Sequence, residues 1–178
     1  MNLHIVLYEP EIPQNTGNIM RTCVAIGAKL HLIEPMGFKI DEAKLRRSAL
    51  DYYDHLVYQT YPNYEAFCQA NPGRYFFLSR YGKHTHSDIA FQAVQDPIYL
   101  IFGKESTGID RKLLAKHLDH TYRIPTTDKV RSLNLSNAVA IVAFEVLRQL
   151  DYPNLEKHEP DVHKGKHFLE QFLDEDPS

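Results

Sequence analysis

The chain has 178 residues, of which 43% are hydrophobic and 24% charged, and this composition predicts one globular domain with a sizeable core. Its apolar runs are too short to span a bilayer and its first residues do not resemble a signal peptide, so we expect a cytoplasmic protein with no membrane partner. The net charge of −3 arises in residues 151–178, which carry 3 basic and 8 acidic side chains, whereas residues 1–150 carry 17 and 15. A mildly basic body of this kind can still bind phosphates.

Short apolar or aromatic segments alternate with helical patterns along the chain. Strands are predicted at 3–9, 29–34, 56–61, 75–79, 97–103 and 120–125, and helices near 16–27, 41–50, 63–70, 110–118 and 134–150. This alternation predicts an α/β fold with a mostly parallel sheet and helices on both faces. Because ligands of such sheets bind at the carboxyl ends of the strands, the loops that leave the strands are the first candidates for a site.

The first strand is followed by "PQNTGNIMR", residues 13–21. Asn15 is expected to cap the following helix, and Gly17 allows a ligand or another backbone to approach closely. Arg21 lies one turn farther on and is directed back over that turn, where it can bind a phosphate or a ribose hydroxyl. Taken alone, the stretch is more simply interpreted as a capped helix with an exposed arginine.

The second loop is "LIFGKESTGI", residues 100–109, where an apolar strand ends at Gly103 and small residues follow Glu105. The stretch lacks the upstream glycine and the Ser or Thr of a Walker loop, and no GxGxxG motif follows the first strand. Sites for nucleoside triphosphates and dinucleotides are therefore disfavoured.

The third loop precedes the long apolar helix and contains "SLNLSN", residues 132–137. Asn134 or Ser136 is expected to cap that helix, yet the loop holds more Ser and Asn than one cap requires. Backbone groups of this loop can read the edge of an adenine, with Leu133 and Leu135 as apolar walls.

Together the three stretches resemble the motifs of the SPOUT superfamily of RNA methyltransferases, in its SpoU branch. The matching positions are Asn15, Gly17 and Arg21 in the first motif, Phe102, Gly103, Glu105 and Gly108 in the second, and Ser132, Asn134, Ser136 and Ala138 in the third, with Asn137 beside it. The resemblance runs from the start to about residue 153, and "IEPMGF" and "LRRSALDY" are similar to the compact tRNA wobble-position 2′-O-methyltransferases (TrmL-like).

That resemblance implies an α/β domain with a C-terminal trefoil knot, a homodimer, and S-adenosylmethionine as cofactor. The implied reaction is 2′-O-methylation of the wobble nucleotide, a cytidine or modified uridine, in certain leucine tRNAs. The implied cofactor-binding residues are Leu78, Gly103, Ile124, Ser132 and Leu133, and the implied catalytic residues are Arg21, Asn15, Glu105 and Asn137. Arg21 and Asn15 are expected to face the RNA from the partner subunit, and no metal is implied.

Two alternatives stay open. The target can be a different tRNA or ribosomal RNA ribose, because loops choose targets. The chain can also be a knotted RNA-binding module without turnover, although the joint presence of Arg21, Glu105, Ser132 and Asn137 argues against this.

The remaining predictions concern dimerisation, the C-terminal segment, and the histidine and cysteine residues. The helices at 16–27 and 134–150 carry more apolar surface than one domain covers easily, which predicts a twofold interface made from them. Residues 1–153 form the predicted methyltransferase domain, and 154–178 an acidic, partly disordered extension with one or two amphipathic turns near 168–173. The tail histidines His158, His163 and His167 are predicted to be linker residues rather than metal ligands. The histidines of "GKHTHS", His84 and His86, are predicted to be loop residues. The thiols of Cys23 and Cys68 are expected to be reduced.

Overall fold

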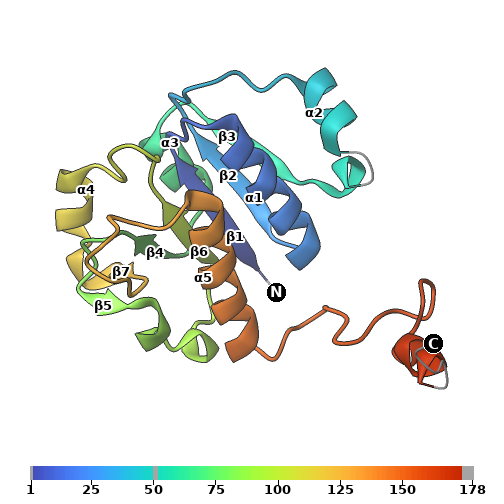
Figure 1. Ribbon diagram of the computed structural model, residues 1–178. Coiled ribbons are helices and arrows are strands. Elements are labelled where there is room, and N and C mark those ends of the chain that lie inside the picture. The colour runs from blue at the N-terminus through green and yellow to red at the C-terminus, as the bar shows by residue number, and fades with distance from the viewer. Residues whose placement is uncertain (1, 50–51, 174–178) are drawn as a thin grey trace.

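The computed structural model describes residues 2–49 and 52–173, and its ribbon shows strands alternating with helices (Figure 1). The strands are β1 (Leu3–Tyr8), β2 (Lys29–Ile33), β3 (Tyr58–Tyr61), β4 (Arg74–Leu78), β5 (His84–Thr85), β6 (Ile98–Phe102) and β7 (Thr121–Arg123). The helices are α1 (Pro13–Ile26), α2 (Glu42–Ala49), α3 (Tyr64–Ala70), α4 (Arg111–Lys116) and α5 (Leu135–Gln149). Short 3-10 turns lie at Tyr53–His55, His86–Asp88, Phe91–Ala93, Leu118–His120 and Phe168–Phe172.

The strands form one parallel sheet in the order β3-β2-β1-β6-β4-β7-β5, which confirms the predicted α/β class. The interpretation of His84 as a loop residue is wrong, because it belongs to the two-residue edge strand β5, where it pairs with Tyr122 of β7. So short a strand has no alternation to detect in the sequence. His86 lies in the 3-10 turn that follows.

Apolar side chains cover both faces of the sheet, as the strand pattern predicts. On one face, Ile5 and Leu100 pack with α1 and α5 in the larger core, and Figure 1 shows these two helices side by side in front of the sheet. On the other face, Val6 and Ile101 pack with Phe67 of α3 and with α4. Alternate residues of a strand therefore enter different cores, and the sheet is a buried middle layer.

Most apolar residues of α1 are buried against the rest of the chain. The expectation that this helix presents a surplus apolar face is wrong for four of its five larger apolar residues, because Ile19, Met20, Cys23 and Ile26 are buried within the chain itself and only Val24 is half-buried. Burial also raises the pKa of the Cys23 thiol to about 12, which keeps it protonated. Both cysteines are free, as expected.

The apolar surface of α5 is only partly covered. Its inner residues are buried, but Ile141 and Phe144 on its outer side are 41% and 48% exposed. The helix thus keeps an unpartnered apolar strip, while α1 does not.

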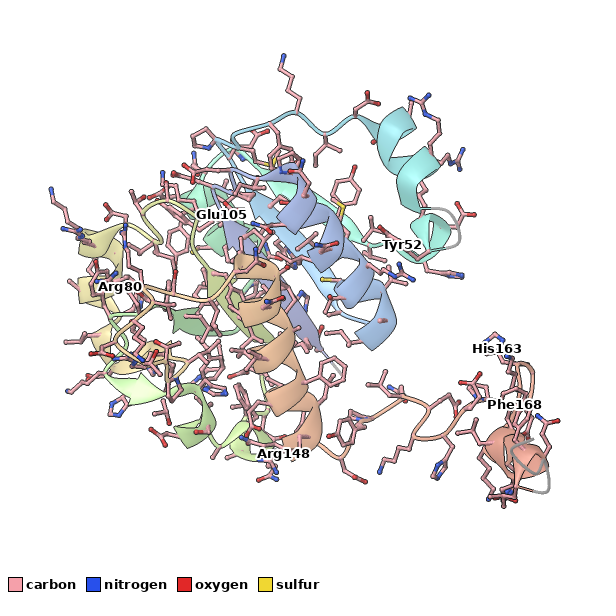
Figure 2. All side chains as sticks on the ribbon, viewed as in Figure 1. Tyr52, Arg80, Glu105, Arg148, His163 and Phe168 are labelled. Atoms are coloured by element: carbon pink, nitrogen blue, oxygen red, sulfur yellow. The ribbon has the colours of Figure 1, made fainter. Side chains whose placement is uncertain are left out.

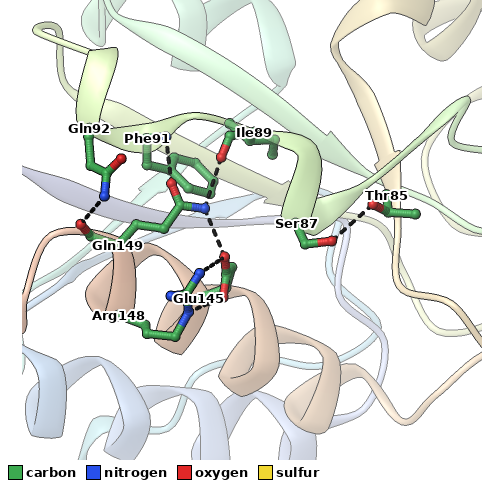
Figure 3. A network of polar contacts seen from close by, with 8 residues as sticks. All are labelled: Thr85, Ser87, Ile89, Phe91, Gln92, Glu145, Arg148 and Gln149. Atoms are coloured by element: carbon green, nitrogen blue, oxygen red, sulfur yellow. Dashed lines mark hydrogen bonds and ion pairs between the residues drawn. The ribbon is translucent and has the colours of Figure 1, made fainter.

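Gln149 at the end of α5 fixes this helix to the segment before β6 (Figure 3). Its side-chain oxygen accepts a hydrogen bond from the Phe91 amide at 2.9 Å, and its nitrogen donates to the Ile89 carbonyl at 2.9 Å and to Glu145 at 2.8 Å. Arg148 donates to the same Glu145 carboxylate through two nitrogens, each at 2.9 Å. These bonds hold the pKa of Glu145 down at about 2.

Replacing Gln149 by alanine is expected to lower the free energy of unfolding by about 1–3 kcal/mol, because two backbone groups lose their partners. Gln92→Ala is the matched control, since Gln92 makes one exposed bond to the Gln149 carbonyl. Its expected cost is below about 0.5 kcal/mol. Urea unfolding of both variants measures the difference, and equal midpoints would contradict the anchoring role of Gln149.

A buried polar chain crosses the other core. His4 Nδ1 lies 2.8 Å from His31 Nε2, and His31 Nδ1 lies 2.9 Å from the Tyr61 hydroxyl. The His4 ring also stacks on Tyr99, with 4.3 Å between centroids. Burial lowers the pKa of both histidines to about 4, helped by the positive charge of Lys29, so both are neutral at pH 7.

This lowering of the pKa makes stability fall in mild acid. Between pH 6.5 and 4 the unfolded chain binds protons at these histidines and the folded chain does not, so the free energy of unfolding decreases as pH falls. We expect a loss of roughly 1–3 kcal/mol between pH 7 and 5. Urea midpoints at pH 7, 6 and 5 test this, with a His4→Gln, His31→Gln double variant expected to show a shallower slope. Parallel slopes for the two proteins would assign the pH dependence to other groups.

The segment after α5 leaves the body of the molecule and ends in the turn at Phe168–Phe172 (Figure 1). The rings of Phe168 and Phe172 meet edge to face at 5.5 Å, while Leu169 and Val162 are 74% and 88% exposed. Within residues 2–49 and 52–173 no three His, Cys, Asp or Glu side chains gather where they could hold a metal ion. Over the same residues, no helix is both long and apolar enough to cross a bilayer.

Candidate active site at the carboxyl edge of the sheet

A pocket of about 550 Å³ lies where the loops after β1, β4, β6 and β7 meet. This is the edge at which a parallel sheet gathers the ends of its strands. Of the residues predicted to bind cofactor, all five line the pocket: Leu78, Gly103, Ile124, Ser132 and Leu133. Asn15 and Glu105 line it as well, so the structure brings together seven of the nine predicted site residues.

Close packing of the second loop shapes one wall of the pocket. A Cβ atom on Gly103 would lie 2.3 Å from the Gly108 carbonyl carbon, so only glycine fits there. Gly108 has a φ of 77°, and its amide donates to the Lys104 carbonyl at 2.9 Å. The two glycines therefore let this loop fold back on itself beside the end of β6.

Glu105 joins the second loop to the first. One carboxylate oxygen accepts a hydrogen bond from the Glu11 amide at 2.8 Å, and the other accepts from the Ile12 amide at 3.3 Å and from Asn15 Nδ2 at 2.9 Å. The carboxylate thus satisfies amides at the start of α1 from a distant part of the chain. Its partners are backbone and amide groups, which indicates a positioning role for Glu105.

The prediction that Asn15 caps α1 is wrong. The residue before the helix is Ile12, whose side chain makes no capping bond, and Asn15 lies within the first turn, buried. Glu105 supplies the acceptor that a local cap would supply, and Asn15 Nδ2 is one of its donors, which leaves Asn15 Oδ1 to accept a bond from elsewhere.

Asn15 extends the connection to the third loop. Its Oδ1 accepts a hydrogen bond from Asn134 Nδ2 at 3.0 Å. Of the two predicted caps of α5, Asn134 is the one observed, and its own oxygen accepts from the Ser136 amide at 2.9 Å and the Ser136 hydroxyl at 2.7 Å. One continuous chain of hydrogen bonds, from Glu105 through Asn15 to Asn134, therefore links all three motifs.

A second pair of contacts reinforces the junction between the first two loops. Glu11 accepts from the Ser106 amide at 2.9 Å and from its hydroxyl at 2.8 Å, and these bonds lower the pKa of Glu11. Lys104 pairs with Glu9 at 2.6 Å, and this bond raises the pKa of Lys104. The two loops thus hold each other through reciprocal bonds, which we call the Glu11–Glu105 clasp.

Arg21 and Asn137 lie outside the pocket of their own chain. Arg21 is exposed on α1, where its guanidinium carbon lies 5.9 Å from the centre of the Tyr52 ring. Asn137 is exposed on the first turn of α5, and its amide donates a long bond of 3.4 Å to Asn134. Neither residue is among those that line the cavity.

The lining residues without a predicted role include one tyrosine and three arginines: Arg80, Tyr81, Arg123 and Arg131. The first two follow the end of β4 and the third ends β7, so their positions after predicted strands were the available clue. The three arginines give this side of the pocket a positive charge.

The pocket suits a nucleoside with a polar substituent. Its volume lies in the range of small-molecule sites, and its walls combine the apolar Leu78, Ile124 and Leu133 with backbone groups near Gly103. The backbone at Gly108 and Ile109 fills the space beside Gly103, so this glycine lets the second loop pack closely and form the wall of the pocket. These features fit S-adenosylmethionine, whose adenine needs apolar walls and edge-on hydrogen bonds.

Comparison with known proteins identifies the class to which this fold and pocket belong. A solved rRNA methyltransferase from Sinorhizobium meliloti with AdoMet bound shares the fold at 25% identity and a TM-score of 0.72, over 84% of this chain and 57% of that one. The chain belongs to the SpoU rRNA Methylase family, whose pattern matches residues 2–144. The family resemblance inferred from the three motifs is therefore confirmed.

Two relatives are nearer in sequence. The tRNA (cytidine(34)-2′-O)-methyltransferase of Escherichia coli K12 is 48% identical over 153 residues, which cover 85% of this chain and 96% of that protein. A protein solved in a study of 2′-OH methylation of C/U34 on tRNA is 42% identical, with a TM-score of 0.76, over 84% of this chain and 96% of that one.

Proposed function

We propose that this chain transfers a methyl group from S-adenosylmethionine to the 2′ oxygen of nucleotide 34, a cytidine or uridine, in tRNA. The observation that carries the proposal is the hydrogen-bonded chain that brings all three motifs to one pocket, from Glu105 through Asn15 to Asn134. The match covers nearly the whole length of both relatives, and their names support the same reaction and target. Leucine tRNAs are the proposed substrates within that class.

In this proposal, Leu78, Ile124 and Leu133 enclose the adenosine, and Gly103 and Ser132 offer polar backbone or hydroxyl groups. The cofactor supplies an activated methyl group, so the protein mainly has to hold the 2′ oxygen in line with it. Glu105 and Asn15 act as positioning residues through the loops they join. We assign Asn137, at the start of α5, to the RNA side of the site.

Arg21 is proposed to hold the target ribose and its phosphate in the site of the partner subunit. A guanidinium is a planar fork of donors with no acceptor atom, so orientation suits Arg21 better than proton removal. The exposed strip of Ile141 and Phe144 on α5 offers the twofold interface that such an arrangement needs. Sedimentation is expected to show a dimer at micromolar concentration.

We further propose that residues 1–153 are the methyltransferase domain and that its C-terminal part forms a trefoil knot. Support for the domain comes from the pocket, whose lining residues run from Ile12 to Ala138, and support for the knot comes from membership of the SpoU family. The named relatives are bacterial tRNA methyltransferases, which supports the cytoplasm as the proposed location.

The deciding experiment is a methyl-transfer assay with labelled S-adenosylmethionine and total tRNA, followed by mapping of the modified nucleotide. We expect label at position 34 of leucine tRNAs. Label at another ribose would identify a differently targeted enzyme. Cofactor binding without transfer to any tRNA or rRNA would instead favour the RNA-binding module without turnover.

Deletion of residues 161–178 is expected to change methyl transfer less than about twofold, because the acidic tail leaves the body and does not line the pocket. Calorimetric titration of the shortened protein with S-adenosylmethionine, together with the transfer assay, measures the effect. Loss of cofactor binding would make the tail part of the site.

A further inference from the structure

Tyr81 lies at the tip of the loop between β4 and β5, at the edge of the pocket. The loop is closely held: the Ser79 amide donates to the Tyr122 carbonyl at 2.9 Å, and the Gly82 amide donates back to the Ser79 carbonyl at 3.0 Å. A Cβ on Gly82 would lie 2.2 Å from the Tyr122 carbonyl carbon, so the loop packs directly on β7. Yet the Tyr81 side chain is 50% exposed. An aromatic ring is therefore presented to solvent from a rigid support.

Two arginines flank this ring. The guanidinium carbon of Arg80 lies 5.0 Å from the ring centre, and that of Arg111, the first residue of α4, lies 5.9 Å from it. We call these three residues the Tyr81 platform. Arg123 and Arg131 line the pocket beside it. Across residues 2–49 and 52–173, no ion pair with a carboxylate is formed by the four arginines of this region, Arg80, Arg111, Arg123 and Arg131.

Four acidic side chains close to the pocket loops are engaged elsewhere. Glu9 pairs with Lys104, and Glu11 and Glu105 accept hydrogen bonds within the clasp. Asp110 caps α4 by accepting from the Leu113 amide at 2.9 Å. The positive charge of the four arginines is therefore available to an anionic partner.

We propose that the Tyr81 platform stacks an unpaired base of the RNA next to the target nucleotide, while the neighbouring arginines contact its phosphates. The inference rests on the proposed function, since it places substrate RNA at this pocket. Unpaired bases stack on aromatic rings and on guanidinium planes, and a duplex offers no free base face. The platform thus selects a nucleotide that lies in a loop.

Stacking and phosphate binding give different responses to substitution and to salt. Tyr81→Leu keeps apolar area but removes the aromatic face, so it is expected to weaken binding of an anticodon stem–loop roughly tenfold to a hundredfold at every salt concentration. Tyr81→Phe keeps the face and is expected to bind within about twofold of the wild type. Arg111→Ala is expected to reduce the slope of log K against log salt by about 0.7 for each phosphate of the single strand that the variant no longer neutralises.

A matched control exists in the tail. Phe168 carries a cation over its ring in the same way, with Lys164 Nζ 4.4 Å from the ring centre. Figure 2 shows Phe168 and Arg80 on opposite sides of the molecule. Phe168→Leu is therefore expected to bind the stem–loop like the wild type.

The experiment measures fluorescence polarisation of a labelled anticodon stem–loop and of a fully paired RNA, with calorimetry for S-adenosylmethionine. The platform predicts that Tyr81→Leu loses stem–loop affinity, binds the paired RNA unchanged and keeps its affinity for the cofactor. Undiminished stem–loop binding by Tyr81→Leu would overturn the inference, and an equal loss of cofactor binding would make Tyr81 a wall of the cofactor pocket. If the wild-type protein neither binds the stem–loop nor methylates tRNA, the proposed function itself is refuted. If the wild-type protein methylates tRNA and Tyr81→Leu binds the stem–loop equally well, only this inference is refuted.

Discussion

Replacing Arg21 by alanine is expected to reduce methyl transfer by about a hundredfold or more, because the target ribose would lose the group that orients it. Cofactor affinity and dimer formation should persist, since Arg21 lies outside the pocket and is exposed on α1. Arg21→Lys keeps the charge but loses the planar fork, so a loss of roughly tenfold to a thousandfold is expected for it. Single-turnover rates with saturating cofactor measure both variants. A lysine variant with full turnover would defeat the orientation argument.

Arg21 does not line the pocket of its own chain. The proposal that Arg21 acts in the pocket of the partner subunit can therefore be tested by mixing two inactive variants. Ser132→Arg would fill the pocket of its own chain and leave Arg21 intact. If Arg21 acts across the interface, mixing the inactive Arg21→Ala and Ser132→Arg proteins restores about a quarter of wild-type activity, because half of the dimers are mixed and each has one complete site. If Arg21 acts within its own chain, the mixture stays inactive.

Replacing Glu105 by glutamine is expected to lower the free energy of unfolding by about 2–4 kcal/mol, although the two side chains have the same shape. Both carboxylate oxygens accept hydrogen bonds, from the Glu11 amide on one side and from the Ile12 amide and Asn15 Nδ2 on the other. A glutamine puts an NH2 group against one of these donors, so at least one bond is broken and two donors face each other. Methyl transfer is expected to fall roughly tenfold to a hundredfold, because all three motif loops depend on this junction.

Glu65→Gln is the control for this substitution. Glu65 is exposed in the first turn of α3, away from the pocket, and its replacement is expected to cost less than about 0.5 kcal/mol. Thermal unfolding and transfer rates of the two variants are compared directly. Equal behaviour would show that Glu105 does not join the loops in solution.

The strand and helix pattern could be predicted because apolar segments such as that of β6 have a clear beginning and end. The edge strand at His84–Thr85 could not, since two residues carry no periodicity and their pairing depends on a neighbour distant in sequence. The residues of the candidate site likewise divide into those that a local pattern predicts and those that depend on distant contacts. Gly103 could be placed at the end of a predicted strand and Ser132 in the loop before the long helix, whereas the burial of Asn15 depends on Glu105, an interaction across 90 residues that no local pattern encodes.

The aromatic at Tyr81 illustrates why the rest of the site escaped prediction. In the sequence it is one of 11 tyrosines, in a stretch that fits an ordinary turn. Its exposure results from the packing of Gly82 on β7, and its charge environment results from Arg111 on a helix that begins 30 residues later. Both are properties of the assembled sheet.

The strand order also determines when this chain can fold. β1 lies between β2 and β6, and its register with β6 joins Leu3 to Ile98. A ribosome must therefore complete more than half of the chain before the first strand gains its second neighbour, and a parallel sheet has no hairpin that could form earlier. Until then the apolar flank of β1 stays open to aggregation. Newly made chains are thus expected to depend on chaperones over this interval, and synonymous codons that slow translation before Ile98 should lower the yield of active enzyme.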